Sequence, residues 1–159
     1  MARPSWSDPL AARFSALRHR NFRLYVTGQI VSLTGTWMQS VAQGWLMHRL
    51  TGSALWLGLL GFAQFLPVTL LSPWAGAVID RMDRRRLLAA TQAAFLVQAV
   101  VLAVAVSTGA VRPWMVLALA ALFGVVNAFD MPLRHSFVVE MTGRDDLGNA
   151  IAINSAVFN

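Results

Sequence analysis

The sequence GAVIDRMDRRR, residues 76–86, separates two long apolar segments. It places six charged side chains within seven positions, residues 80–86, which we name the charged loop. The 30 residues before it (50–79) and the 25 residues after it (87–111) contain no Asp, Glu, Lys, Arg or His. About 20 apolar residues suffice for a helix to cross a bilayer. We therefore interpret both segments as membrane spans and the charged loop as a turn at the membrane surface.

The composition agrees with a membrane protein. The 159 residues are 57% hydrophobic and 13% charged, whereas soluble domains contain about 25% charged residues. All 13 basic residues are arginines, and they give a net charge of +6. They lie between apolar segments instead of along one solvated face, which argues against a nucleic-acid partner. The chain has no cysteine, and no His and acidic residues are spaced as metal ligands, so we predict no metal site.

The expected fold is an all-α integral membrane protein embedded in the lipid bilayer. We predict spans at about 24–47, 54–79, 87–106 and 114–130, and the start of a fifth span from about 147. Residues 1–23 form a cytoplasmic amino-terminal segment. Asp8 and Pro9 are typical of a helix start, and Leu10, Phe14 and Leu17 then predict a basic amphipathic helix on the membrane surface. An unstructured basic leader is the alternative.

The arginines predict the orientation of the spans. Eleven lie in the amino-terminal segment, the charged loop and the loop after the fourth span, against two in the other loops. Short cytoplasmic loops carry the excess of Lys and Arg. We therefore expect a multi-pass protein of the cell membrane with a cytoplasmic amino terminus.

A polar stripe runs along the first span. Its members recur at steps of three and four residues, which places them on one helical face: Gln29, Ser32, Thr36, Gln39 and Gln43. Unpaired amides are costly in hydrocarbon, so this face either lines a transport pathway or joins the helix to its neighbours. Asn127 in the fourth span is a further candidate for the pathway. Pro67 lies in the middle of the second span and predicts a kink there.

Two aspartates are expected at the same depth near the inner surface. Asp80 ends the second span and Asp130 ends the fourth. A carboxylate at the membrane boundary is stabilised by an arginine, so we predict a pair between Asp130 and Arg84 or Arg85. A loop that only sets the topology is the alternative.

The charged loop resembles a signature of a known family. Gly76-x-x-x-Asp80-Arg81-x-x-Arg84-Arg85 is similar to the loop between helices two and three of the major facilitator superfamily, G-x-x-x-D-R-x-G-R-R, except that Asp83 replaces the second glycine. Further stretches resemble the bacterial branch related to the enterobactin exporter: NFRL at 21–24, GTWMQ at 35–39, LTGS at 50–53 and NAIA at 149–152. The resemblance extends from about Leu17 to Asn159.

The resemblance implies a transmembrane helix bundle in which this chain is part of the amino-terminal half of a 12-helix transporter. Its partner is the carboxy-terminal half, and the substrate site lies between the halves. By position, Asp80 and Arg81 would form a conformational latch with that other half. Arg84 and Arg85 would pair with Asp130, and Gly76 would allow close helix packing.

The expected function is secondary active transport, specifically export of a small molecule by alternating access. No cofactor is expected. Proton coupling needs an ionisable group at depth. Apart from Asp130 at the very end of the fourth, the predicted spans contain no Asp, Glu or His, so the coupling residue is expected outside this chain. The alternatives are a complete four-span protein that acts as an oligomeric small transporter, or a structural or assembly membrane protein. An enzyme is disfavoured because no nucleophile, base and metal set accompanies the spans.

Overall fold

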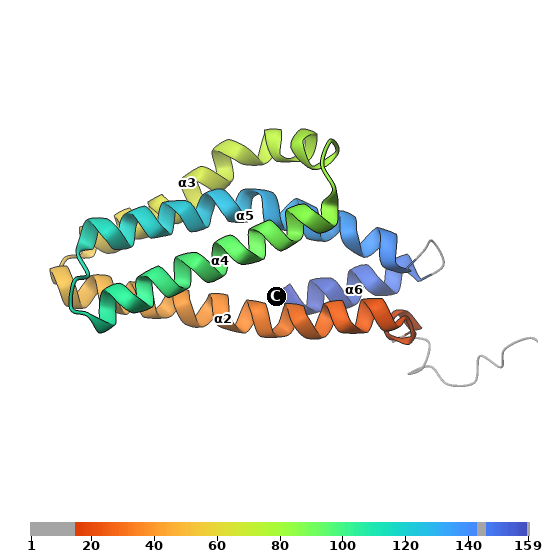
Figure 1. The fold of residues 1–159 in the computed structure, drawn as a ribbon, viewed down its shortest axis with the longest axis horizontal. Coiled ribbons are helices and arrows are strands. Elements are labelled where there is room, and N and C mark those ends of the chain that lie inside the picture. Colours follow the sequence, from red (N-terminus) through yellow and green to blue (C-terminus); the bar gives the residue numbers. More distant parts are fainter. Residues whose placement is uncertain (1–14, 143–145, 159) are drawn as a thin grey trace, which may run out of the picture. The chain divides into compact units, whose positions relative to one another are not determined.

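The computed structural model describes residues 15–142 and 146–158, and all regular structure in these ranges is helical. Figure 1 shows the element order. The elements are η1 (Ser15–Arg18), α2 (Arg20–Thr51), α3 (Ala54–Ile79), α4 (Arg84–Ser107), α5 (Pro113–Thr142) and α6 (Leu147–Phe158). Most of the amphipathic helix predicted from Asp8 lies outside the described residues. Leu17, the last of its three named apolar residues, lies in the short 3-10 helix η1.

Three helices in the described part of the chain are long and apolar enough to cross a membrane. They are Ala54–Ile79, Arg84–Ser107 and Pro113–Ser136. The predicted first span lies within α2, whose 32 residues exceed the length required. Its polar stripe makes α2 less hydrophobic than the other three, so its crossing of the bilayer stays a prediction.

The apolar side chains point outward to an extent that water would not tolerate. Only 6% of the apolar window of α3 is buried, and Leu55 and Phe65 on that helix are each 70% exposed. Isolated exposed apolar residues are normal on soluble proteins, but continuous apolar surfaces of this kind are not. The hydrocarbon chains of a bilayer can cover such apolar surfaces. The exposed apolar side chains therefore agree with a partial transmembrane helix bundle.

The chain divides into two compact units. The first comprises the described residues up to Thr36 and from His135 onward. Its core contains Phe22 and Val26 of α2, Val138 of α5 and Ala150 of α6, with Ala16 of η1 fully buried beside them.

The second unit is Trp37–Arg134. Its core lies where α2 ends and α3 begins, close to the turn between α4 and α5. Met47, Leu60, Leu102, Val116 and Ala120 form this cluster, so all four helices contribute to it.

Glycines in the left-handed conformation end α2 and α4. Gly52 has φ 62° and Gly109 has φ 70°. The Gly52 N–H donates to the carbonyl of His48 at 2.7 Å. A glycine just past a helix end adopts positive φ without the steric cost of a Cβ, which permits these two tight turns.

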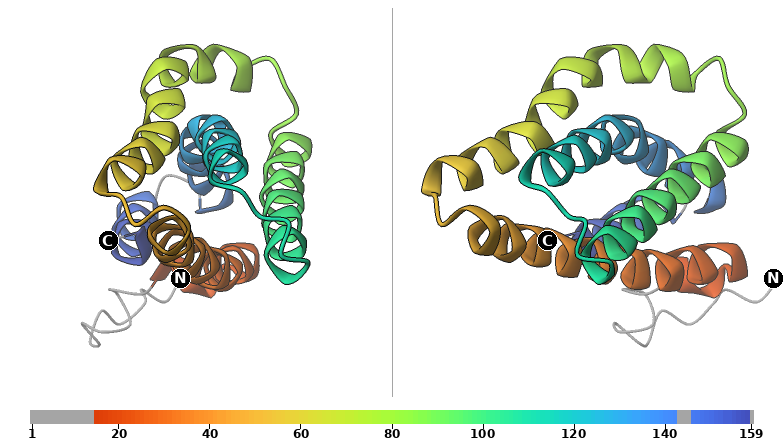
Figure 2. Two further views of the ribbon diagram at one scale, coloured as in Figure 1. Left: turned by 90° about the vertical axis from the view of Figure 1, so that its left-hand side faces the viewer. Right: turned by 60° about the vertical axis from the view of Figure 1, so that its left-hand side comes forward.

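The helix α3 is bent (Figure 2), and it holds Pro67 and Pro73 within its length. It also approaches α5 very closely. A Cβ added at Gly124 of α5 would collide with the backbone carbonyl of Gln64 and lie 3.2 Å from Cγ of Pro67. The bent segment of α3 therefore passes α5 at a position where only glycine fits.

The structure differs from the sequence-based expectation at the end of the fourth span. We expected the span to end at Asp130 and an inner loop to follow, but α5 continues through Pro132 to Thr142. Proline removes one backbone hydrogen bond. Asp130 and Arg134, one turn apart, bridge that position through an ion pair, and this contact favours a continuous helix.

Candidate functional site

The charged loop joins α3 to α4 and is built around Asp83. The Asp83 carboxylate accepts hydrogen bonds from the backbone N–H groups of Arg85 at 2.9 Å and Arg86 at 3.0 Å. These contacts make Asp83 the N-cap of α4, a role that aspartate fills well. The bond from the Arg86 N–H, followed by that from Arg85, holds the pKa of Asp83 below its usual value. This explains why an aspartate can stand where the superfamily pattern has glycine.

The latch residues of the same loop are largely exposed. Asp80 caps the end of α3, and its backbone N–H donates to the carbonyl of Gly76 at 3.0 Å. An Arg84 nitrogen lies 3.9 Å from Asp80 Oδ1, while Arg81 and Arg85 are exposed. Exposed pairs of this kind contribute little to stability. A Cβ at Gly76 would meet nothing within 4 Å in the described part of the chain. The predicted role of Gly76 in close helix packing therefore concerns a contact with another part of the protein, and it stays a prediction.

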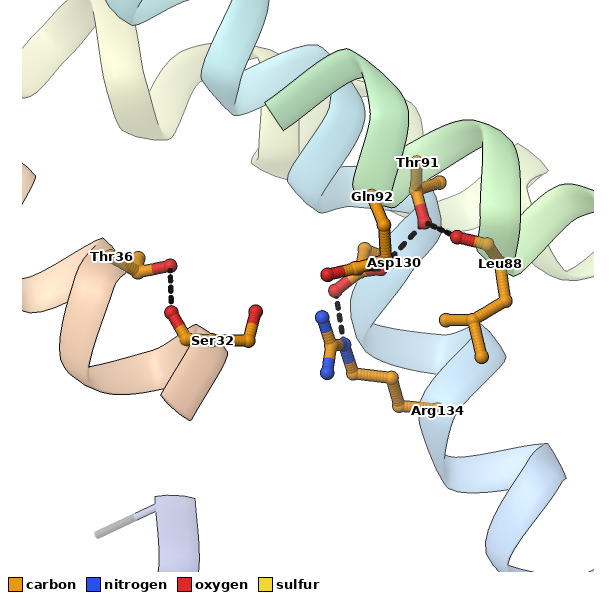
Figure 3. A network of polar contacts seen from close by, with 7 residues as sticks. All are labelled: Ser32, Thr36, Leu88, Thr91, Gln92, Asp130 and Arg134. Carbon is orange, nitrogen blue, oxygen red and sulfur yellow. Dashed lines mark hydrogen bonds and ion pairs between the residues drawn. The ribbon is translucent and has the colours of Figure 1, made fainter. Parts of the chain in front are cut away.

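A buried polar cluster surrounds Asp130 (Figure 3). Its Oδ2 forms an ion pair with Nε of Arg134. Its Oδ1 accepts a hydrogen bond from Thr91 Oγ1 at 2.7 Å and another from Gln92 Nε2 at 3.0 Å. Asp130 is 3% exposed and Arg134 is 5% exposed. The hydrogen bonds from Thr91 and Gln92 thus join α4 to a charged pair on α5 that is removed from water.

In the structure, Asp130 has an ion-pair partner that the sequence analysis did not name. Here the ion pair is with Arg134 on the same helix, and the pairing with Arg84 or Arg85 stays a prediction. The sequence carried a signal for Arg134, because residues four apart on a helix are neighbours. That signal was missed because Arg134 was assigned to a loop. Nothing in the sequence pointed to Thr91 or Gln92.

Two members of the polar stripe hydrogen bond to neighbouring helices. Gln39 Nε2 of α2 donates to Gln98 Oε1 of α4 at 2.7 Å. Gln98 Nε2 in turn donates to the carbonyl of Leu119 on α5 at 3.4 Å. Gln64 Nε2 of α3 donates to Gln43 Oε1 at 3.0 Å. These amide pairs connect helices in the way expected of the packing alternative, while a role in the pathway stays a prediction.

The remaining pathway candidates have more local surroundings. Thr36 Oγ1 donates to the backbone carbonyl of Ser32 at 3.0 Å, within α2 (Figure 3). Gln29 is 4% exposed, and its Nε2 has no hydrogen-bond partner among the described residues. Asn127 on α5 is half-buried.

An apolar groove runs along α2. It has a volume of about 660 Å³ and is lined by Trp37, Met38, Val41, Ala42 and Trp45. The Arg49 guanidinium lies 5.1 Å from the ring centre of Trp45, a cation–π contact. At about 3.6 residues per turn these side chains lie on the other side of the helix from Gln39 and Gln43, so α2 presents an amide face and an aromatic face.

The amino-terminal unit contains a separate polar contact. Ser15 Oγ donates to Asp146 Oδ1 at 2.6 Å, and His19 Nε2 lies 2.9 Å from Asp146 Oδ2. The hydrogen bond from Ser15, followed by that from His19, keeps the pKa of Asp146 below its usual value. Asn149 accepts from the backbone N–H of Ala16 at 3.3 Å. These contacts fasten η1 to the start of α6. No group of three or more His, Cys, Asp or Glu in the described residues is placed to hold a metal ion.

Comparison with known sequences gives the family. Residues 11–159 match the family described as transmembrane secretion effector, which lies within the major facilitator superfamily. This chain is a transmembrane secretion effector family member. The match covers nearly the whole chain and agrees with the outward-facing apolar helices, so the family member is a multi-pass membrane protein.

One curated relative of this transmembrane secretion effector family member is the staphyloferrin A transporter of Staphylococcus aureus (strain NCTC 8325 / PS 47). It is 27% identical over 138 residues, which make up 86% of this chain and 35% of the relative. The chain therefore spans about a third of the length of that relative. No solved structure matches the chain.

Proposed function

We propose that this chain is the first part of a secondary transporter that exports a small molecule by alternating access. The observation that carries the proposal is the family match over residues 11–159. The similarity to a staphyloferrin A transporter supports transport and suggests staphyloferrin A as the first compound to test. In this proposal the carboxy-terminal half of the same transporter completes the substrate site, and the amino terminus lies in the cytoplasm of a cell-membrane protein.

The charged loop acts in this proposal as the latch of the inner gate. Asp80 and Arg81 contact the other half in the outward-facing state, and Arg84 and Arg85 hold the loop against the base of α5. The exposure of Asp80, Arg81 and Arg85 in the described structure supports this role, since exposed charges can contact a second half of the protein. A salt bridge made in one state alone biases the equilibrium by its energy in that state.

Transport is tested with the full-length protein in everted membrane vesicles. An exporter should accumulate labelled staphyloferrin A in everted vesicles when a pH gradient is applied, and vesicles without the protein should not. Accumulation in right-side-out vesicles alone would show import and refute the proposed direction. Equal accumulation with and without the protein would refute staphyloferrin A as its substrate.

The latch is tested by Asp80→Asn and Arg84→Ala in the same vesicles. Both should impair export severalfold while membrane insertion stays normal, because the gate loses a state-dependent contact. Arg86→Ala is the matched control, since it removes the same charge two residues after Arg84, at a position outside the latch pattern. Export at the wild-type rate by both latch variants would rule out this role.

A further inference from the structure

We propose that the apolar groove on α2 binds one phospholipid with an anionic headgroup. The acyl chain lies in the groove, and the phosphate contacts Arg49 at the end of the helix. Five side chains line the groove: Trp37, Met38, Val41, Ala42 and Trp45. This lipid site requires only that α2 borders the membrane, so it stands independently of the proposed export.

The shape of the groove follows from two rows of side chains on α2. Residues four apart form ridges on a helix, and Trp37, Val41 and Trp45 form one such ridge. Met38 and Ala42 form the next ridge, in which the single methyl of Ala42 leaves the space between the ridges open. The groove has a volume of about 660 Å³, within the range of sites for small organic ligands. It is therefore large enough to hold a flexible apolar chain.

None of the large groove side chains is covered by the described part of the chain. Their exposed fractions run from 61% at Trp45 to 70% at Val41. Water would make such a continuous apolar surface unfavourable, whereas a hydrocarbon chain would cover it. The exposed indoles thus indicate an apolar occupant.

The length of the groove matches one leaflet of a bilayer. Arg49 follows Trp37 by 12 residues, or about 18 Å along the helix. One leaflet contributes about 15 Å, which is half of the hydrocarbon thickness. Trp45 lies one turn before Arg49, where the guanidinium is 5.1 Å from the ring centre, and indoles favour the membrane interface. A chain that starts at Arg49 therefore reaches Trp37 near the middle of the bilayer.

The charge at this end of α2 favours an anionic headgroup. The turns that follow α2 and α4 carry Arg49 and Arg112, both exposed. No Asp or Glu occurs in residues 9–79 or 84–129, and the ion pairs of the described residues do not include Arg49. A guanidinium binds phosphate oxygens through two parallel hydrogen bonds. A phospholipid thus supplies an anion for Arg49 and an apolar chain for the groove in one molecule, whereas an apolar helix packed there would supply no anion.

Tryptophan fluorescence tests the site with brominated lipids. The full-length protein would be placed in phosphatidylcholine vesicles that contain a minor fraction of phosphatidylglycerol. Either the chains of the phosphatidylglycerol or those of an equal fraction of the phosphatidylcholine carry bromine, which quenches only the indoles that it contacts. We expect stronger quenching by the brominated phosphatidylglycerol, because the site selects the anionic lipid. Trp37→Phe and Trp45→Phe should each lose part of this excess, and Trp74→Phe, an exposed tryptophan on α3, should keep it.

Two further variants separate the headgroup from the chain. Arg49→Gln should lower the excess quenching severalfold, because the phosphate loses its partner. Arg112→Gln is the matched control, since it removes the same charge from an exposed position outside the groove, and it should keep most of the excess. Ala42→Leu should also lower the excess severalfold while Arg49 stays in place, because the larger side chain fills the groove. Ala42 is exposed, so this change leaves the core of the helix bundle intact.

Three outcomes would overturn the lipid site. Equal quenching by the two brominated lipids would show that the groove does not select an anionic headgroup. Quenching that neither Trp37→Phe nor Trp45→Phe alters would show that another part of the protein covers the groove. An unchanged excess in both Arg49→Gln and Ala42→Leu would place the bound lipid elsewhere on the protein.

Discussion

At the scale of single residues, Asp83 shows how a departure from a family pattern can be structurally sound. Glycine at this position would allow a tight turn through its free backbone. Aspartate instead accepts the N–H groups of Arg85 and Arg86, which would otherwise lack partners at the helix start. The turn is therefore held by a side-chain contact in place of backbone freedom.

Asp83→Ala should lower the thermal stability of the protein, whereas Asp83→Asn should retain most of it, because asparagine caps helices about as well as aspartate. The folded state lowers the pKa of Asp83. Its ionic contribution is therefore present above the unfolded pKa and is lost as the pH falls through the folded pKa. Thermal unfolding measured across acidic pH should show the Asp83→Asn variant losing less stability than wild type. Identical pH profiles for the two proteins would contradict the capping role.

At the scale of helices, the contact between α3 and α5 depends on one glycine. Gly124 leaves room for the backbone of α3 at Gln64, next to Pro67. Small residues of this kind let membrane helices approach closely, since packing drives their association in lipid.

Gly124→Ala should destabilise the protein by about 1–3 kcal/mol, because the added methyl overpacks the crossing against backbone atoms that cannot rotate away. Gly58→Ala on α3 is the matched control, since its Cβ would meet nothing within 4 Å, and it should be neutral or slightly stabilising. Thermal unfolding in detergent measures both. Equal melting temperatures for Gly124→Ala and wild type would show that the two helices are not in contact in the assembled protein.

The amide pair between α2 and α4 belongs to the same scale. Gln98 is 1% exposed, so Gln39→Leu would leave its Oε1 without a donor. We expect a loss of about 1–3 kcal/mol.

Gln39→Leu combined with Gln98→Leu should recover part of that loss, because neither amide then remains unpaired. Unfolding and transport measured together separate the two interpretations of the stripe. Restored stability with a changed transport rate or substrate preference would support a pathway role, and restoration of both would support packing alone.

At the scale of the whole molecule, the distribution of arginines predicts which loops face the cytoplasm. The described chain has no cysteine, so single cysteines can report the side of each loop. Arg86→Cys in the charged loop should react with a membrane-impermeant maleimide only after the cells are permeabilised. Arg112→Cys, between α4 and α5, should react in intact cells. The reverse pattern would invert the topology and remove the latch from the inner side.

The alternation of long apolar segments with charged turns was enough to establish an all-helical membrane bundle, because spanning helices need only length and hydrophobicity. The bounds of α3 and the start of α6 followed from the same pattern. The family resemblance also rested on residues that are consecutive in the chain, such as the charged loop.

The partners of the buried polar groups could not be obtained in this way. The contacts from Thr91 and Gln98 to other helices are set by how far α4 is rotated about its axis, and a nearly uniform apolar segment does not specify that rotation. The end of α5 was also misjudged, because Pro132 and the charges around it are typical of a loop. An ion pair across one helical turn and two hydrogen bonds from α4 make that segment helical, and these contacts form only when the helices pack together.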